Sequence, residues 1–273
     1  MFKVAIAQVE SSTDKRDNLR TALSMIESAG GRGAELVAFP EFLMAFSPPS
    51  QSAEELAQVA ETVDGSFISA LRGAARKNHI AVLATIYETA PVVNRVFDTA
   101  VWLDALGQIV MVYRKLHLYD AFGFRESDKF QPGSDFAAPV ISAQCRFGVM
   151  ICYDLRFPEM ARMLALEGAN VLVSPSGWVQ GDLKIDHWQT MVKARALENG
   201  CYLIAPGQTG NIYLGHSMIV DPLGRTILDL GERAGLEFAD LDENLVNDTR
   251  EKLPLLKNRR ADVYAHRLSA KLP

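Results

Sequence analysis

Apolar residues spaced three and four positions apart predict helices in several parts of the chain. Leu19, Leu23 and Ile26 follow this spacing, and their helix is expected to end at Gly30-Gly31. A capping box at Ser52-Ala-Glu-Glu55 predicts the start of a second helix, because its serine and glutamate can bond each other's backbone N–H groups. Further helices are expected around Phe67, Leu71 and Ala74, over residues 158–167, and over residues 186–199 with Trp188, Val192 and Ala196 buried.

Short apolar runs predict strands between and after these helices. Strands are expected over residues 4–9, 36–39, 80–86, 99–103, 109–113, 147–151, 171–173, 202–205, 217–220, 226–230 and 235–239. Helices and strands alternate in the first part of the chain, and strands dominate the last part. The sequence contains no internal repeat and no interdomain linker, so this order predicts an α/β chain folded as one domain over residues 1–273.

One of these apolar runs ends in a cysteine, in the stretch Phe147-Gly-Val-Met-Ile-Cys-Tyr-Asp-Leu-Arg-Phe-Pro-Glu159. Pro158 suits the first turn of a helix, so the stretch predicts a buried strand, a sharp elbow and a helix. Such an elbow holds a nucleophile clear of the sheet and beside backbone N–H donors. The nearby helix N-terminus is expected to favour the thiolate of Cys152. The alternative is that Cys152 is a buried core cysteine.

Two other strand ends carry charged residues. Glu41 follows the apolar run at residues 36–39, and Lys115 follows the run at residues 109–113. A carboxylate in this position is either a loop residue that accepts local N–H groups or a general base held in a cleft. A lysine at a strand end is either a solvated charge or part of a site.

Together the three strand ends resemble the nitrilase superfamily of carbon–nitrogen hydrolases, whose members use a Glu–Lys–Cys triad in this chain order. The matching residues are Glu41 in FPEF, Lys115 in YRKLHLYD and Cys152 in CYDLRFPE. The resemblance covers nearly the whole chain, and the branch that looks nearest holds omega-amidases and deaminated-glutathione amidases. It implies a four-layer α-β-β-α sandwich, usually paired into homodimers.

The resemblance also implies a mechanism. Cys152 would attack an amide carbonyl, and Glu41 would take the thiol proton and return it to the departing nitrogen. Lys115 would place a positive charge at the oxyanion, assisted by the backbone N–H of Tyr153. Glu126 matches a second glutamate near the lysine of the family, although it could equally be a surface residue in a loop. This mechanism needs no metal and no organic cofactor.

Substrate recognition is less specified by the sequence. Arg156 could bind a substrate carboxylate, or it could pair with Asp154 or Glu159 within the elbow. Trp178 departs from the omega-amidase pattern and is expected to form a flat apolar wall of the pocket, with no obvious partner for a second carboxylate. Simple aliphatic amides are therefore expected to compete well with omega-amides of dicarboxylic acids.

Composition excludes several other classes of protein. The net charge is −5 and no basic stripe is present, which argues against a nucleic-acid partner. No apolar run approaches the length of a membrane span, and the first residues do not have the pattern of a signal peptide. The odd number of cysteines without a CxxC pair predicts a reducing cytoplasm, and the five histidines show no metal-binding spacing.

The sequence therefore predicts an amidase that hydrolyses a small linear carboxamide to an acid and ammonia. Two alternatives use the same triad, a nitrilase and an N-carbamoyl amidohydrolase. An alternative of another class is a catalytically inactive scaffold on the same fold, which the intact triad argues against.

Overall fold

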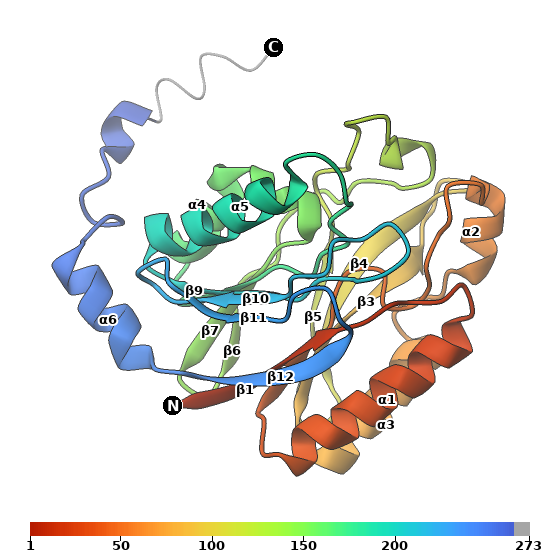
Figure 1. Cartoon of the computed structure of the whole chain (residues 1–273), viewed down its shortest axis with the longest axis horizontal. Helices are drawn as coiled ribbons and strands as arrows, with labels where there is room; N and C mark the ends of the chain where they lie inside the picture. The colour runs from red at the N-terminus through yellow and green to blue at the C-terminus, as the bar shows by residue number, and fades with distance from the viewer. Residues whose placement is uncertain (265–273) are drawn as a thin grey trace.

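Two six-stranded sheets lie face to face in the computed structural model, which describes residues 1–264 (Figure 1). In spatial order, the first sheet contains β12 (Gly235–Leu241), β1 (Phe2–Gln8), β2 (Leu36–Ala38), β3 (Ala81–Thr89), β4 (Val96–Leu103) and β5 (Ile109–Arg114). The second contains β11 (Thr226–Asp229), β10 (Met218–Val220), β9 (Tyr202–Ala205), β8 (Val171–Val173), β7 (Cys145–Val149) and β6 (Val140–Ser142). Both sheets mix parallel and antiparallel pairs.

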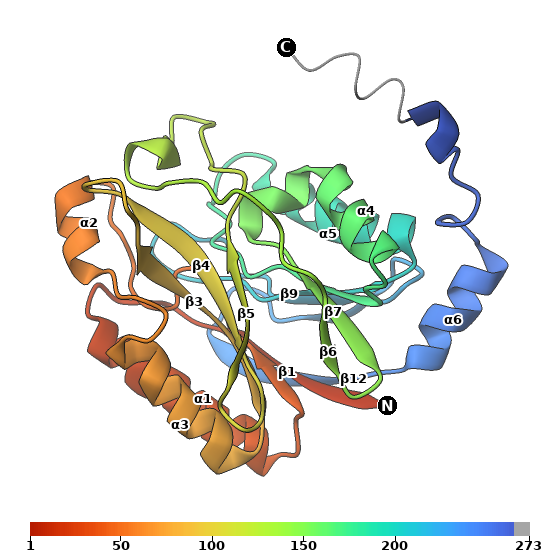
Figure 2. The ribbon, with the colours of Figure 1, turned by 180° about the vertical axis from the view of Figure 1, so that it is seen from behind.

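Helices cover the outer face of each sheet, as Figures 1 and 2 show from opposite sides. The helices α1 (Lys15–Gly31) and α3 (Ser66–Asn78) pack on the first sheet, and α4 (Pro158–Leu166) and α5 (Lys184–Asn199) pack on the second. The short α2 (Ala53–Val59) lies beside β3, and α6 (Glu243–Lys252) follows β12. The layers are therefore α-β-β-α, and the predicted sandwich is confirmed.

The central strands are apolar on both faces because each face is covered. In β1, Phe2, Val4 and Ile6 belong to the core between the sheets, whereas Ala5 and Ala7 belong to the core under α1 and α3. Such two-sided burial produces a continuous apolar run rather than an alternating one. This is why the sequence pattern located these strands.

Two predicted strands are longer in the structure, and the added residues include polar side chains. Strand β3 continues to Thr89 instead of ending at residue 86, and β4 begins at Val96 instead of residue 99. The extra residues pair across the two strands, with Tyr87 opposite Asp98. The sequence also missed β6, which has three residues, and α6, in which only Val246 and Thr249 are buried. Both lack the long apolar pattern on which the prediction depended.

Within residues 1–264, no helix combines the length and the hydropathy that crossing a bilayer requires.

Candidate active site

Glu41, Lys115 and Cys152 meet between the two sheets at one end of the sandwich. Glu41 lies just beyond β2, Lys115 follows β5 directly, and Cys152 lies just beyond β7 in the opposite sheet. All three side chains are buried. β2 is parallel to β3, and β3 and β5 each pair antiparallel with β4, so β2 and β5 end at the same end of the first sheet. The structure therefore brings together the three residues that the sequence selected.

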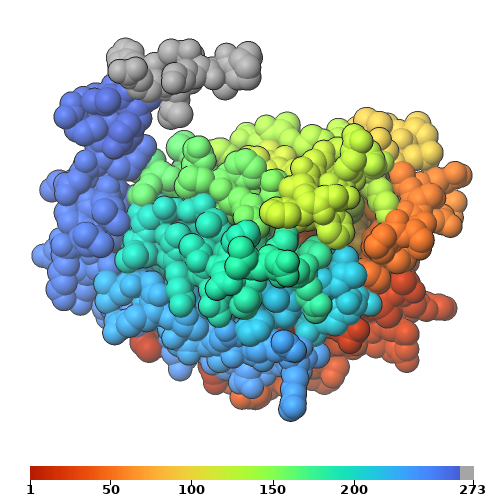
Figure 3. All heavy atoms as spheres, turned by 45° about the horizontal axis from the view of Figure 1, so that its top comes forward, coloured from red at the N-terminus to blue at the C-terminus, as the bar shows by residue number. Residues whose placement is uncertain are grey.

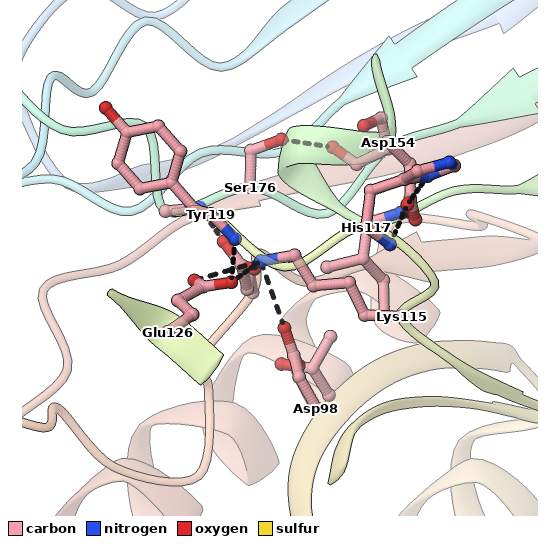
Figure 4. A network of polar contacts seen from close by, with 12 residues as sticks. Asp98, Lys115, His117, Tyr119, Glu126, Asp154 and Ser176 are labelled. Carbon is pink, nitrogen blue, oxygen red and sulfur yellow. Dashed lines mark hydrogen bonds and ion pairs between the residues drawn. The ribbon is translucent and has the colours of Figure 1, made fainter. Parts of the chain in front are cut away.

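The ammonium group of Lys115 is the centre of this cluster (Figure 4). Its Nζ donates a 2.7 Å hydrogen bond to Oε1 of Glu41 and bonds of 3.0 and 2.9 Å to Oε1 and Oε2 of Glu126. Glu126 begins the 3₁₀ helix η1 (Glu126–Asp128) and also accepts the backbone N–H of Tyr119 at 2.7 Å. Lys115 is thus a buried cation between two carboxylates, and Glu126 is part of the cluster rather than a surface residue.

Glu41 is held from three sides. Besides the bond from Lys115 to Oε1, its Oε2 accepts the backbone N–H of Gly177 at 2.6 Å. Its backbone carbonyl accepts a 2.9 Å bond from the side-chain amide of Gln208. These contacts fix both the backbone and the carboxylate of Glu41, which is what a general base needs in order to stay aligned.

Charges and burial set the protonation of the cluster. Burial alone would lower the pKa of Lys115, but Glu126 and Glu41 outweigh it and hold that pKa well above its usual range. Burial, and next the charge of Glu41, raise the pKa of the Cys152 thiol well above its usual range, although Lys115 opposes this. Burial and Glu41 therefore favour the thiol form of Cys152. This direction is opposite to the thiolate that a helix N-terminus was expected to favour.

Cys152 occupies a strained elbow. It begins the 3₁₀ helix η2 (Cys152–Arg156) with a φ of 45°, in the left-handed region that side-chain-bearing residues rarely adopt. Its own N–H donates to the carbonyl of Pro175 at 2.9 Å. No acceptor within residues 1–264 takes the N–H of Tyr153, so this donor remains available next to the thiol. The predicted strand, elbow and helix are confirmed.

Asp154 is a buried aspartate that holds the elbow in place through several hydrogen bonds, and the sequence did not indicate this role. Asp154 accepts the backbone N–H of Ile151 at 2.8 Å, the hydroxyl of Tyr113 at 2.6 Å and the backbone N–H of His117 at 3.1 Å. Nδ1 of His117 lies 2.7 Å from the same carboxylate (Figure 4). Tyr113 and His117 flank Lys115 in sequence. The hydrogen bonds of Asp154 therefore connect the elbow to the strand end that carries the lysine.

Arg156 and Trp178 form a pair that neither sequence alternative described. Arg156 makes no ion pair among residues 1–264, and the Nε of Arg156 is buried without an acceptor. The carboxylate of Asp154 already accepts hydrogen bonds from other donors. Its guanidinium lies 4.6 Å from the centre of the Trp178 ring. Both side chains, together with Tyr153 and Cys152, line a narrow recess beside the nucleophile. Of the two alternatives for Arg156, the pairing with Asp154 or Glu159 is not found, and binding of a substrate carboxylate stays a prediction.

The main opening to Cys152 is a cavity of about 320 Å³. Phe42, Tyr119, Glu126, Gly177 and Tyr213 are among its walls. Trp178 does not line this cavity; it lines the narrow recess beside Cys152, where its ring packs against Arg156.

The loop over residues 116–135 covers the cavity, and Figure 3 shows it on the surface between the segments near residues 50 and 180. Nζ of Lys184 donates to the hydroxyl of Tyr119 at 2.7 Å and lies 4.0 Å from the Phe122 ring centre. On the other side, Nζ of Lys129 is 3.5 Å from Oγ of Ser47. Arg125 and Lys129 both line the cavity, so cationic side chains are present there.

Within residues 1–264, no group of three or more His, Cys, Asp or Glu side chains has an arrangement that could hold a metal ion. The three cysteines Cys145, Cys152 and Cys201 are free and buried.

Comparison with known proteins agrees with the site. Residues 3–251 match the sequence model of the family described as Carbon-nitrogen hydrolase. A deaminated glutathione amidase of Escherichia coli O157:H7 is 37% identical over 94% of this chain and 97% of its own length. The deaminated glutathione amidase of Bos taurus is 33% identical over 96% of this chain and 83% of its own length.

Solved structures show the same fold. The Caenorhabditis elegans NitFhit protein matches with a TM-score of 0.89 and 32% identity over 96% of this chain, which spans 66% of that longer protein. An amidase from Nesterenkonia sp. AN1, described with an active-site cysteine, matches with a TM-score of 0.80 and 26% identity over 97% of this chain and 99% of its own. With this fold and these relatives, the chain belongs to the carbon–nitrogen hydrolase family, in the amidase branch of the nitrilase superfamily.

Proposed function

We propose that this enzyme is an amidase that uses Cys152 as nucleophile, Glu41 as general base and acid, and Lys115 as the charge that stabilises the oxyanion. The observation that carries the proposal is the buried Glu41–Lys115–Glu126 cluster beside a thiol on a strained elbow. An ion pair with only a structural role would not need a thiol beside it, held in a left-handed backbone conformation and facing a cavity.

The reaction then proceeds in two halves. As Sγ of Cys152 attacks the amide carbon, its proton passes to Glu41 and the carbonyl oxygen becomes an oxyanion near Lys115 and the N–H of Tyr153. Glu41 returns the proton to the nitrogen, the C–N bond breaks, and ammonia or an amine leaves. Water then attacks the thioester and gives its proton to Glu41, and the acid leaves as Cys152 regains its proton.

The raised pKa of Cys152 supports this use of Glu41. A thiol that is not ionised at rest needs a base at the moment of attack. Glu126 accepts two hydrogen bonds from the ammonium group of Lys115. Its role in the proposal is to orient that cation.

For substrate, we propose a small carboxamide that carries a carboxylate. Arg156 has no acid partner among residues 1–264 and lies beside Cys152, so it is available to bind such a group. Relatives named deaminated glutathione amidase fit this class, because glutathione is a peptide with free carboxylates.

We expect amides to be hydrolysed faster than nitriles or carbamoyl amino acids, because Glu41 is placed to protonate a leaving amine. An omega-amide with a carboxylate should have a higher kcat/KM than a simple aliphatic amide, which revises the sequence-based expectation that the two compete well for lack of a partner for the second carboxylate. In Arg156→Gln, KM for the omega-amide should rise about tenfold or more, the usual effect of losing a bond between charged groups. KM for the aliphatic amide should stay unchanged.

The measurement is ammonia release from matched amides, nitriles and carbamoyl amino acids. Arg20→Gln is the control, since Arg20 is an exposed arginine of α1 that lines neither the cavity nor the recess. A preference for the nitrile would overturn the amidase assignment, and equal effects of Arg156→Gln on both amides would remove Arg156 as the carboxylate anchor.

We also propose that the enzyme assembles as a homodimer or a multiple of it. Leu253, Val263 and Tyr264 are 42%, 44% and 46% exposed in the segment after α6, which runs along one side of the body (Figure 3). Exposed apolar side chains clustered near a terminus need a surface to cover them. Light scattering at micromolar concentration should give at least twice 30.1 kDa, and a monomer alone would refute the proposal.

A further inference from the structure

Asp98 is a buried acid at the site that the mechanism above does not use. It lies within β4, is 2% exposed, and neither of its carboxyl oxygens accepts a hydrogen bond among residues 1–264. The nearest cation is Lys115, whose Nζ lies 3.8 Å from Oδ2, beyond hydrogen-bonding distance (Figure 4). A buried carboxylate without partners is costly, so the ionised form of Asp98 requires an explanation.

Lys115 has no donor left for Asp98. An ammonium group has three N–H bonds, and Lys115 directs them to Oε1 of Glu41 and to the two carboxylate oxygens of Glu126. With both glutamates ionised and Lys115 charged, the cluster already carries one net negative charge. Ionised Asp98 would add a second negative charge in a buried environment without adding any hydrogen bond.

Most of the charged groups around Asp98 also favour its neutral form. Glu41 approaches from the end of β2, Glu126 from η1, Lys115 from the end of β5, and Tyr87 pairs with it from β3. Burial, and next the charge of Glu41, raise the pKa of Asp98 well above its usual range, and Lys115 only partly opposes this. A neutral carboxylic acid has one O–H donor, and the carboxylate of Glu41 is the neighbour that can accept it.

We propose that Asp98 is a positioning residue that remains a neutral carboxylic acid at neutral pH and donates a hydrogen bond to Glu41. This deepens the proposed function, because Glu41 is the general base in it. The bond from Asp98 would hold the Glu41 carboxylate from the side of β4, while Lys115 and Gly177 hold it from the others. Asp98 would also limit the buried site to a single net negative charge.

Two variants separate this proposal from its alternatives. Asp98→Asn keeps the shape and an N–H donor but cannot ionise, so kcat should stay within a few-fold of wild type. Asp98→Leu removes the donor, so kcat should fall about tenfold or more with little change in KM. In wild type, ionisation of Asp98 at high pH places a second charge beside Glu41, so the alkaline limb of the kcat profile should move to higher pH in Asp98→Asn.

A spectroscopic measurement tests the proton directly and does not depend on turnover. Infrared spectra of the wild-type enzyme at neutral pH should contain the carbonyl band of a protonated carboxylic acid, shifted in D₂O and absent in Asp98→Asn. The control Asp64→Asn, at an exposed acid, should leave the band in place.

Three outcomes would overturn the proposal. The first is a carbonyl band in Asp98→Asn identical to that of wild type. The second is a loss of a hundredfold or more in kcat for Asp98→Asn. The third is an unchanged kcat in folded Asp98→Leu. If Asp98→Leu does not fold, the band and Asp98→Asn still decide. Failure of the proposed function is distinguishable, because turnover in Cys152→Ala would refute that mechanism while leaving the infrared result intact.

Discussion

Replacing Cys152 with alanine is expected to abolish turnover while leaving the fold intact. The substitution removes the only atom proposed to bond to the substrate, and loss of a nucleophile from a triad typically costs about 10⁴-fold or more in kcat. The left-handed φ of 45° is already imposed on a residue with a Cβ, so alanine adds no new backbone strain. The volume lost is small, and stability should fall by only about 1 kcal/mol.

The measurement is ammonia release by the purified variant, with thermal unfolding to confirm that it is folded. Cys145→Ala is the matched control, because Cys145 is a buried cysteine at the opposite end of β7 from the elbow and lines neither the cavity nor the recess. That control should keep most of its activity. Appreciable hydrolysis by Cys152→Ala would contradict the mechanism.

Replacing Lys115 with methionine should affect both activity and stability. Loss of a charge at the oxyanion typically costs about 100-fold or more in kcat, with a smaller effect on KM. The structure adds an effect that the sequence did not suggest: Lys115 is 1% exposed and faces three carboxyl groups, those of Glu41, Glu126 and Asp98. Removing one partner of a buried ion pair typically costs about 3–5 kcal/mol.

The stability of Lys115→Met should depend on pH in a defined direction. Without the lysine, the buried carboxyl groups have raised pKa values in the folded state, as Glu126 and Asp98 already do through burial in the wild type. Unfolded carboxyl groups titrate near pH 4, so above that pH the folded state binds more protons than the unfolded state. The free energy of unfolding should therefore rise as pH falls from neutral toward about pH 5.

Chemical denaturation of the variant and the wild type at several pH values tests this. Lys77→Met is the control, because Lys77 is exposed and pairs with Glu27 at the surface, where an ion pair contributes about 0–1 kcal/mol. A variant with the kcat and stability of wild type would show that the charge of Lys115 contributes neither to turnover nor to folding.

The sequence predicted most of the sandwich because its central strands are buried on both faces. Runs such as residues 147–151 and 171–173 have no polar positions that could be confused with a surface strand. The ends of these runs also placed Glu41, Lys115 and Cys152, since a charged or reactive residue directly after a buried strand is a local signal. The resemblance to a known family then connected signals that are far apart in sequence.

What the sequence did not predict depends on contacts between distant segments. Asp98 was excluded from β4 because an acid interrupts the apolar pattern, and only the structure shows that β4 begins before it. An acid within an apolar run of strand residues is a signal that could have marked it. For Arg156 the sequence left open whether it binds a substrate carboxylate or pairs with a nearby acid. The structure shows Asp154 bonded to Tyr113 and His117, and the guanidinium of Arg156 packed on the Trp178 ring.

The pairing of β1 with β12 has a consequence for synthesis of the chain. Antiparallel pairs run from Phe2–Leu241 to Gln8–Gly235, so one whole edge of β1 has no partner until β12 has left the ribosome. At ordinary translation rates this leaves an open edge for roughly 10 to 50 s, long enough for a nascent chain to pair wrongly with another. A chain arrested soon after Cys152 would contain every residue proposed to act in catalysis, yet it would lack β8 to β11 and the edge strand β12. Enzymatic activity should therefore appear late and abruptly during translation, and the unfinished chain should be a client of chaperones that bind exposed strand edges.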